Sequence, residues 1–183
     1  MLDCSYGISS HLTYRERVEL FQLAKTPGVL SIVEIGSYLG ASATAFAAAL
    51  QATSNTAARV YCVDTWNNDA MTEGQRETMR VFLGNVHKYG ETIVPIRGWS
   101  TTVVDEIARN LVKIDVLFID GDHSYEGCLA DWRAYEPLLR PGSRVAFHDV
   151  AWAGGVRRVV EEEVLPRSAA HARLPNLWWA EIR

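Results

Sequence analysis

Cysteine is scarce in this sequence, and no two cysteines have the spacing of a metal or redox site. The three residues, Cys4, Cys62 and Cys128, are widely separated and include no C-x-x-C pair. Such a set predicts neither a disulfide framework nor a zinc knuckle. A reducing cytoplasm is therefore the expected compartment.

Long apolar runs are missing as well. No segment approaches the roughly 18 apolar residues that a membrane span needs, and no basic region followed by an apolar block opens the chain. We therefore expect a soluble, cytoplasmic protein with no membrane partner and no cleaved leader.

Positive charge and two common glycine motifs are also lacking. The formal net charge is −4, and the one tight basic pair, Arg157-Arg158, lies on a predicted helix. This gives no electrostatic surface for a nucleic-acid partner. The sequence has neither the G-x-G-x-x-G of dinucleotide sites nor the lysine that follows a phosphate-binding loop, which disfavours an NAD oxidoreductase.

Apolar strands alternate with amphipathic helices along the 183 residues. Strands are expected at 31–35, 59–64, 92–96, 114–119 and 145–148, with one or two more in the tail 172–183. Helical periodicity marks 13–25, 41–50, 79–86, 103–111, 128–139 and 156–164. This alternation predicts βαβ units and a mostly parallel α/β sheet.

One stretch organises the rest. A β-branched run from Ser31 stops at Gly36, a loop continues to Gly40, and an alanine-rich segment follows. This order predicts a strand, a tight loop and a helix whose free N–H groups face the loop. Glycine removes the Cβ where a backbone bends sharply or a ligand comes close, so the loop is a candidate nucleotide cradle.

Nearly every predicted strand ends on a polar or glycine residue. Ligands of parallel sheets bind outside the carboxyl ends of the strands, so these residues are expected to converge on one edge. They are Glu34, Gly36, Asp64, Gly98, Ser100, Asp120, His148 and Asp149.

At these residues the sequence resembles the class I S-adenosylmethionine-dependent methyltransferases, and more narrowly the branch of small-molecule and sugar O-methyltransferases. The resemblance covers 29–163 and rests on Glu34-Ile35-Gly36-Ser37-x-x-Gly40, Asp64, Gly98-Trp99-Ser100, Phe118-Ile119-Asp120-Gly121-Asp122-His123-Ser124-Tyr125-Glu126 and Phe147-His148-Asp149. It implies a Rossmann-like, doubly wound sheet with one antiparallel strand near the C-terminus. It also implies S-adenosylmethionine as cofactor and a small polyhydroxylated acceptor.

We expect one domain over 1–183, with an N-terminal arm and helix (1–28), a cofactor-binding core (29–165) and C-terminal strands (166–183). The cofactor-binding residues that the resemblance implies are Glu34, Gly36, Ser37, Tyr38, Gly40, Ser42, Asp64, Thr65, Trp66, Gly98, Trp99, Ser100 and Asp120. Asp64 would accept the ribose hydroxyls. A structural turn at the glycine loop, a solvated acid at Asp64, a helix cap at Ser100 and core packing of Trp66 are the alternatives.

The resemblance places the chemistry at His123, as general base, and at Asp120. It places a divalent cation, Mg or Mn, on Asp120, His148 and Asp149. The family usually has a carboxylate where this chain has His148, and imidazole suits Mn, Fe or Zn better than Mg. The alternatives are a buried, hydrogen-bonded His148, a metal-independent methyltransferase, or a cofactor-binding module without catalysis.

Adjacent indoles at Trp178 and Trp179 suggest assembly. Neighbouring side chains of a strand point to opposite faces, so one indole must face away from the side of the sheet that buries the other. An exposed tryptophan is a common interface anchor. We therefore expect a homodimer.

Overall fold

A single seven-stranded sheet organises the computed structural model, which describes residues 3–69 and 74–183. The strands are β1 (Ser31–Ile35), β2 (Arg59–Asp64), β3 (Ile93–Arg97), β4 (Val116–Ile119), β5 (Arg144–His148), β6 (Ser168–Arg173) and β7 (Leu177–Ile182). The helices are α1 (Asp3–Tyr6), α2 (Tyr14–Ala24), α3 (Ala41–Ala52), α4 (Met79–Val86), α5 (Ser100–Asn110), α6 (Tyr125–Tyr135) and α7 (Gly154–Val159). Short helical turns follow at η1 (His87–Thr92), η2 (Glu136–Leu138), η3 (Val160–Val164) and η4 (Leu165–Arg167).

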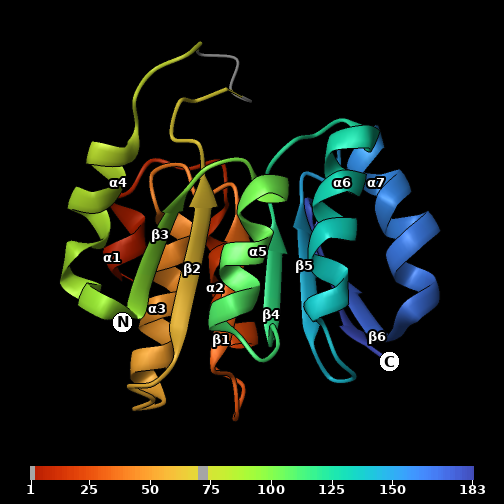
Figure 1. The fold of residues 1–183 in the computed structure, drawn as a ribbon, viewed down its shortest axis with the longest axis horizontal. Coiled ribbons are helices and arrows are strands. Elements are labelled where there is room, and N and C mark those ends of the chain that lie inside the picture. Colours follow the sequence, from red (N-terminus) through yellow and green to blue (C-terminus); the bar gives the residue numbers. More distant parts are fainter. Residues whose placement is uncertain (1–2, 70–73) are drawn as a thin grey trace.

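The strand order is β3-β2-β1-β4-β5-β7-β6 (Figure 1). Strands β1 to β5 pair in parallel, and only β7 runs against its neighbours β5 and β6. The predicted doubly wound sheet with one antiparallel strand near the C-terminus is confirmed. Among the described residues, no helix is long and apolar enough to cross a membrane.

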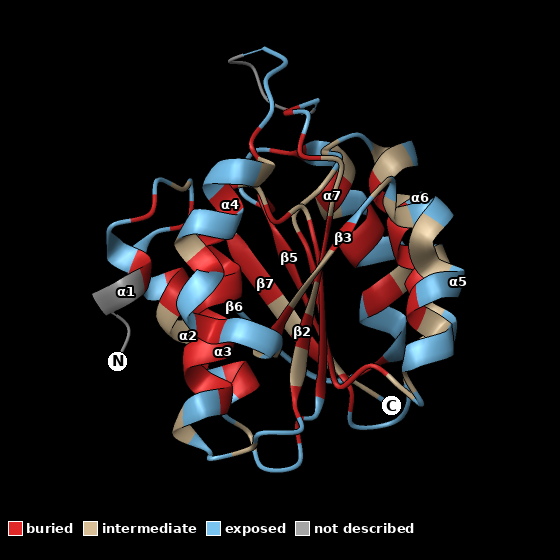
Figure 2. Ribbon diagram, turned by 60° about the vertical axis from the view of Figure 1, so that its left-hand side comes forward, coloured by how far each residue is buried: buried red, intermediate tan, exposed pale blue. Residues whose placement is uncertain are grey.

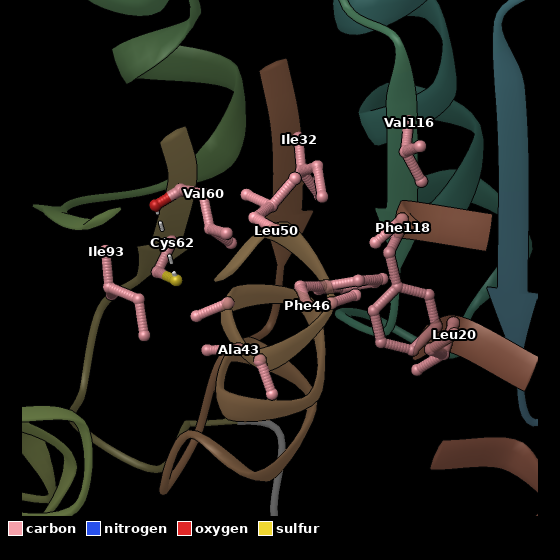
Figure 3. Packing of buried hydrophobic residues seen from close by; sticks show 14 of the residues in the cluster. Leu20, Ile32, Ala43, Phe46, Leu50, Val60, Cys62, Ile93, Val116 and Phe118 are labelled. Carbon is pink, nitrogen blue, oxygen red and sulfur yellow. Dashed lines mark hydrogen bonds between the residues drawn. The ribbon is translucent and has the colours of Figure 1, made fainter. Parts of the chain in front are cut away.

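Helices cover both faces of the sheet. Figure 2 shows α2, α3 and α4 against one face and α5, α6 and α7 against the other. Strand alternation sends Ile32 into the core under α3 and its neighbour Val33 into the core under α6. In the first core, Phe46 meets Phe118 edge-on with ring centroids 5.9 Å apart (Figure 3). Full burial of such a side chain stabilises the fold by about 1.5–3 kcal/mol.

Helix α2 begins at the predicted capping box. The Glu16 carboxylate accepts from the Thr13 backbone N–H at 2.7 Å, while the Thr13 hydroxyl accepts from the Glu16 backbone N–H at 3.4 Å. Each side chain satisfies a donor that the first turn would otherwise leave unpaired. The box therefore fixes where the N-terminal arm ends and the helix begins.

The tight turn that follows β1 packs against the backbone at the end of β4. Gly36 has φ +85°, and a Cβ there would lie 2.0 Å from the backbone oxygen of Asp120. Gly40 has φ +89°, and its Cβ would lie 2.8 Å from Val86 on α4. Both glycines are thus required by the protein's own packing.

A homodimer was expected because one of the two adjacent indoles would be exposed, and that premise is wrong. Trp178 packs beside Phe147, and Trp179, on the other face, donates from Nε1 to Glu19 of α2 at 2.7 Å. Because helices cover both faces of the sheet, each indole packs within the chain. Cys62 and Cys128 are buried free thiols, and the side chain of Cys4 lies outside the described part.

Candidate active site

A cavity of about 600 Å³ opens at the carboxyl ends of the parallel strands. Five segments far apart in sequence form its walls: the arm at 9–12, the β1–α3 loop, the end of β2, the β3–α5 loop and the β4–α6 loop. The predicted site residues that line it are Gly36, Ser37, Tyr38, Ser42, Asp64, Thr65, Gly98, Trp99, Ser100, Asp120 and His123. Most of the residues proposed for the cofactor are thus brought to one cavity.

Three of the predicted cofactor residues lie behind the cavity wall. Trp66 is fully buried, packs on Phe82 with centroids 4.8 Å apart, and donates from Nε1 to the Tyr38 carbonyl at 3.0 Å. Gly40 contacts α4, and Glu34 is buried under the turn at Gly36. The structure therefore places the Trp66 indole in the core rather than on the cavity.

Asp64 organises the loop at the end of β2. One carboxylate oxygen accepts from the Tyr38 backbone N–H at 2.8 Å, and the other accepts from the Trp66 backbone N–H at 2.6 Å. Burial raises its pKa, and these two bonds oppose the rise. With a third backbone bond from Ser37, the carboxylate still has one of its roughly four lone-pair sites for a hydroxyl donor in the cavity.

Glu34 is a buried ionisable group on β1. Its side chain is fully buried, and neither carboxylate oxygen has a hydrogen-bond partner among residues 3–69 and 74–183. Burial raises its pKa to about 7, against a smaller lowering by the nearby hydroxyls of Ser42 and Ser37. The Ser37 hydroxyl is likewise buried and unpartnered within those ranges.

The sequence analysis missed Asp131, which also lines the cavity. It is 5% exposed, and it accepts a short hydrogen bond from the Ser100 hydroxyl. Burial raises its pKa to about 6. A signal was present in the sequence, because Asp131 falls on the same helix face as Cys128 and Tyr135, where an acid is out of place.

His123 and Asp149 form a close pair at the ends of β4 and β5. The His123 Nε2 lies 2.9 Å from an Asp149 oxygen, and this bond is the main reason that the pKa of His123 is raised. Trp152, which the sequence analysis also missed, packs edge-on against His123 at 4.8 Å and donates to Asp149 at 2.7 Å. Burial works against ionisation of Asp149, but the bonds from both histidines hold its pKa well below its usual range.

His148 is a buried histidine held on both sides. Its Nδ1 lies 3.2 Å from Asp120 and 3.2 Å from Asp149, while its Nε2 lies 3.6 Å from Glu16 and 3.3 Å from the Asn176 amide. Burial alone would lower the pKa of this imidazole, but the three carboxylates raise it to about 12. The geometry is that of the buried, hydrogen-bonded alternative.

Comparison with known proteins identifies the family of this chain. Residues 33–150 match a family described as "Methyltransferase domain". The chain belongs to this methyltransferase family. The predicted enzyme class, an S-adenosylmethionine-dependent methyltransferase, is thereby confirmed.

Several solved methyltransferases share the fold. An O-methyltransferase from Bacillus cereus in complex with SAH matches with a TM-score of 0.75 and 17% identity, over 98% of this chain and 86% of that one. TomG, an O-methyltransferase from Streptomyces achromogenes in complex with SAM, gives 0.72 and 18%, over 93% and 81%. CalS11, a TDP-rhamnose 3'-O-methyltransferase, gives 0.68 and 21%, over 93% and 81%. At such identities the likeness establishes the fold.

A relative by sequence is the Sinorhizobium fredii protein described as "Uncharacterized protein y4gI". It is 34% identical over 120 residues, which are 64% of this methyltransferase chain and 13% of that protein. The present chain therefore spans only a small part of the curated relative that it matches.

The cradle of this methyltransferase fits S-adenosylmethionine. That cofactor carries an ammonium group and ribose hydroxyls, which can donate to the two cavity-lining acceptors at this end, the Ser37 hydroxyl and the Asp64 carboxylate. Ser37 and Asp64 are therefore the residues that would hold it there.

A metal would find a different donor set from the one predicted. The ligand atoms that lie within 4.8 Å of one another belong to Asp120, His123 and Asp149. His148, the predicted third ligand, contacts both acids through its Nδ1. Two carboxylates and an imidazole suit Mn, Fe or Zn in this methyltransferase.

Proposed function

We propose that this methyltransferase transfers a methyl group to a hydroxyl oxygen of a small polyhydroxylated acceptor, such as a sugar or a natural product. The observation that carries the proposal is the His123–Asp149 pair, whose imidazole lines the cavity. The shared fold with O-methyltransferases supports it, among them an enzyme named for the 3'-hydroxyl of TDP-rhamnose.

In this proposal His123 is the general base. Its Nε2–H donates to Asp149, so the lone pair of Nδ1 takes the proton from the acceptor hydroxyl. Asp149 holds the ring in that tautomer and stabilises the imidazolium that forms. S-adenosylmethionine, when bound, supplies an electrophilic methyl group on a sulfonium. Asp120, whose carboxylate lies beside His123, positions the acceptor hydroxyl.

The test is transfer of a radiolabelled methyl group from S-adenosylmethionine to TDP-rhamnose, free sugars and catechols. We expect labelled product with at least one of these acceptors, and its loss in His123→Ala. If S-adenosylhomocysteine binds but nothing is methylated, the non-catalytic binding module becomes the better hypothesis. If calorimetry detects no S-adenosylhomocysteine binding, both hypotheses fall.

A metal-assisted reaction is the second candidate, because three ligand atoms of Asp120, His123 and Asp149 cluster. A bound cation would lower the pKa of an acceptor hydroxyl. Full activity in a chelator supports His123 as the base, whereas loss of activity in chelator and its return with Mn supports the metal.

A further inference from the structure

The guanidinium of Arg17, which follows the capping-box residue Glu16 in α2, is buried. Arg17 is only 7% exposed, and arginine is seldom buried without partners. Its Nε donates to the Leu12 carbonyl at 3.2 Å, one terminal nitrogen donates to the Ile8 carbonyl at 3.4 Å, and the other donates to the Ser5 carbonyl. All three acceptors belong to the N-terminal arm, defined here as residues 5–12.

The same arm forms part of the cavity wall. Ser9, Ser10, His11 and Leu12 line the same cavity as the residues of the β4–α6 loop. Ile8 packs with Leu39 of the β1–α3 loop, and the His11 ring stacks on Tyr38 at 6.5 Å. The arm therefore rests on the loop that Asp64 holds.

We infer that Arg17 is a positioning residue of the ligand site, which holds the arm in place as a wall of the cofactor cavity. The identity of the ligand rests on the proposed function, whereas the role of Arg17 as a clamp rests on its own contacts. One planar guanidinium fixes three points of the arm at once, which the single ammonium of lysine does not reproduce.

The arm affects ligand affinity through the fraction of molecules in which it is held in place. If only a fraction of molecules have the wall in place, the apparent affinity for a ligand that contacts it falls by that fraction. Arg17 thus acts on binding through the arm, while its side chain lies away from the cavity. Arg15, on the same turn of α2 but exposed, provides a matched control.

The experiment measures S-adenosylhomocysteine binding by calorimetry in the full chain. We expect Arg17→Met to weaken binding by about tenfold or more, Arg17→Lys to weaken it by a smaller factor, and Arg15→Met to stay within about twofold. If the wild-type chain does not bind S-adenosylhomocysteine, the proposed function fails. The role of Arg17 in holding the arm is then tested by hydrogen exchange alone.

Hydrogen exchange of the arm amides in the ligand-free chain provides that decision. The expected result is faster exchange at residues 5–12 in Arg17→Lys than in Arg15→Met, with unchanged exchange in β1 and β4. In the wild type, S-adenosylhomocysteine should slow exchange of the arm. Equal exchange of the arm in Arg17→Lys and Arg15→Met overturns the clamp, and so does unchanged S-adenosylhomocysteine affinity in both Arg17 variants.

Discussion

The polar groups at the β1 end and at the β4–β5 end of the site differ in how far their hydrogen bonds are satisfied. Under the β1–α3 loop, Glu34 and the Ser37 hydroxyl have no hydrogen-bond partner among the described residues. At the ends of β4 and β5, the polar atoms of His123, His148 and Asp149 bond to one another. Among the described residues, the β1 end therefore has polar atoms without hydrogen bonds, whereas those of the β4–β5 end are bonded to one another.

This difference separates binding from chemistry. An unpaired buried carboxylate is destabilising, and the unpartnered Ser37 hydroxyl near it lines the cavity, so the β1 end gains most from a ligand with hydrogen-bonding groups. A satisfied network is already fixed in geometry before the acceptor binds. We therefore expect substitutions at the β1 end to change affinity and stability, and substitutions at the β4–β5 end to change turnover.

The largest effect should come from His123→Ala. Loss of the general base should lower turnover by about 10²- to 10⁴-fold, while S-adenosylhomocysteine affinity stays within about twofold. Turnover and calorimetry on the same preparation measure both. His87→Ala, at an exposed position beyond α4, is the control. Equal loss of affinity and turnover would erase the distinction between the two ends.

Glu34→Gln should reveal the cost of the unpaired acid. The pKa of Glu34 is about 7 in the fold against 4.5 for the free side chain, so the folded state binds more protons between these values. Its contribution to the free energy of unfolding is therefore full below pH 4.5 and falls as the pH rises to 7, by roughly 3 kcal/mol at most. Urea unfolding at pH 5 and 8 should show this fall in the wild type and a smaller one in Glu34→Gln. Parallel curves would show that Glu34 is paired.

Asp64→Ala should weaken S-adenosylhomocysteine by about 1.5–3 kcal/mol, the range for hydrogen bonds to a charged group. Part of the loss will come from the loop, because the same carboxylate holds the Tyr38 and Trp66 amides. Calorimetry of Asp64→Ala and of the exposed Asp105→Ala gives the comparison. Unchanged binding would remove Asp64 from the cofactor site.

The architecture was accessible from sequence because strands and turns leave local signals. The strand at 59–64 has the bounds that the structure gives to β2, since a largely apolar run there ends on an acid. The convergence of Asp64 and Asp120 on one edge follows from parallel pairing alone. Where a residue's partner is distant in sequence, local patterns carry no information about it.

His148 shows that limit. Its position at a strand end was predictable, but its contact with Glu16 depends on how α2 packs against the finished sheet. Trp66 and Arg17 follow the same rule, because one turns into the core and the other reaches back to the arm only in the assembled fold. Asp131 is different, since an acid on an apolar helix face could have been noticed.

The smallest effect concerns pH. The bond to Asp149 raises the pKa of His123, so kcat/KM should rise with pH through a value above 6.5, as the imidazole loses its proton. Asp149→Asn removes the charge that favours imidazolium, so the acidic limb should move to lower pH. A profile from pH 5 to 9 measures this. A limb that stays in place would assign the titration to another group.

The single reversal of direction in the sheet bears on how this site can be moved to another protein. Because β7 runs against β5, Leu177 at its start pairs with His148 at the end of β5. The preceding turn then places Asn176 where its amide donates to Asp149 at 2.8 Å and accepts from the Ala151 backbone N–H at 3.0 Å. A parallel strand would bring its last residue to that edge instead. For a designer, the transplantable unit is therefore discontinuous, and a graft of 29–165 that omits the terminal hairpin would leave Asp149 without one of its anchors.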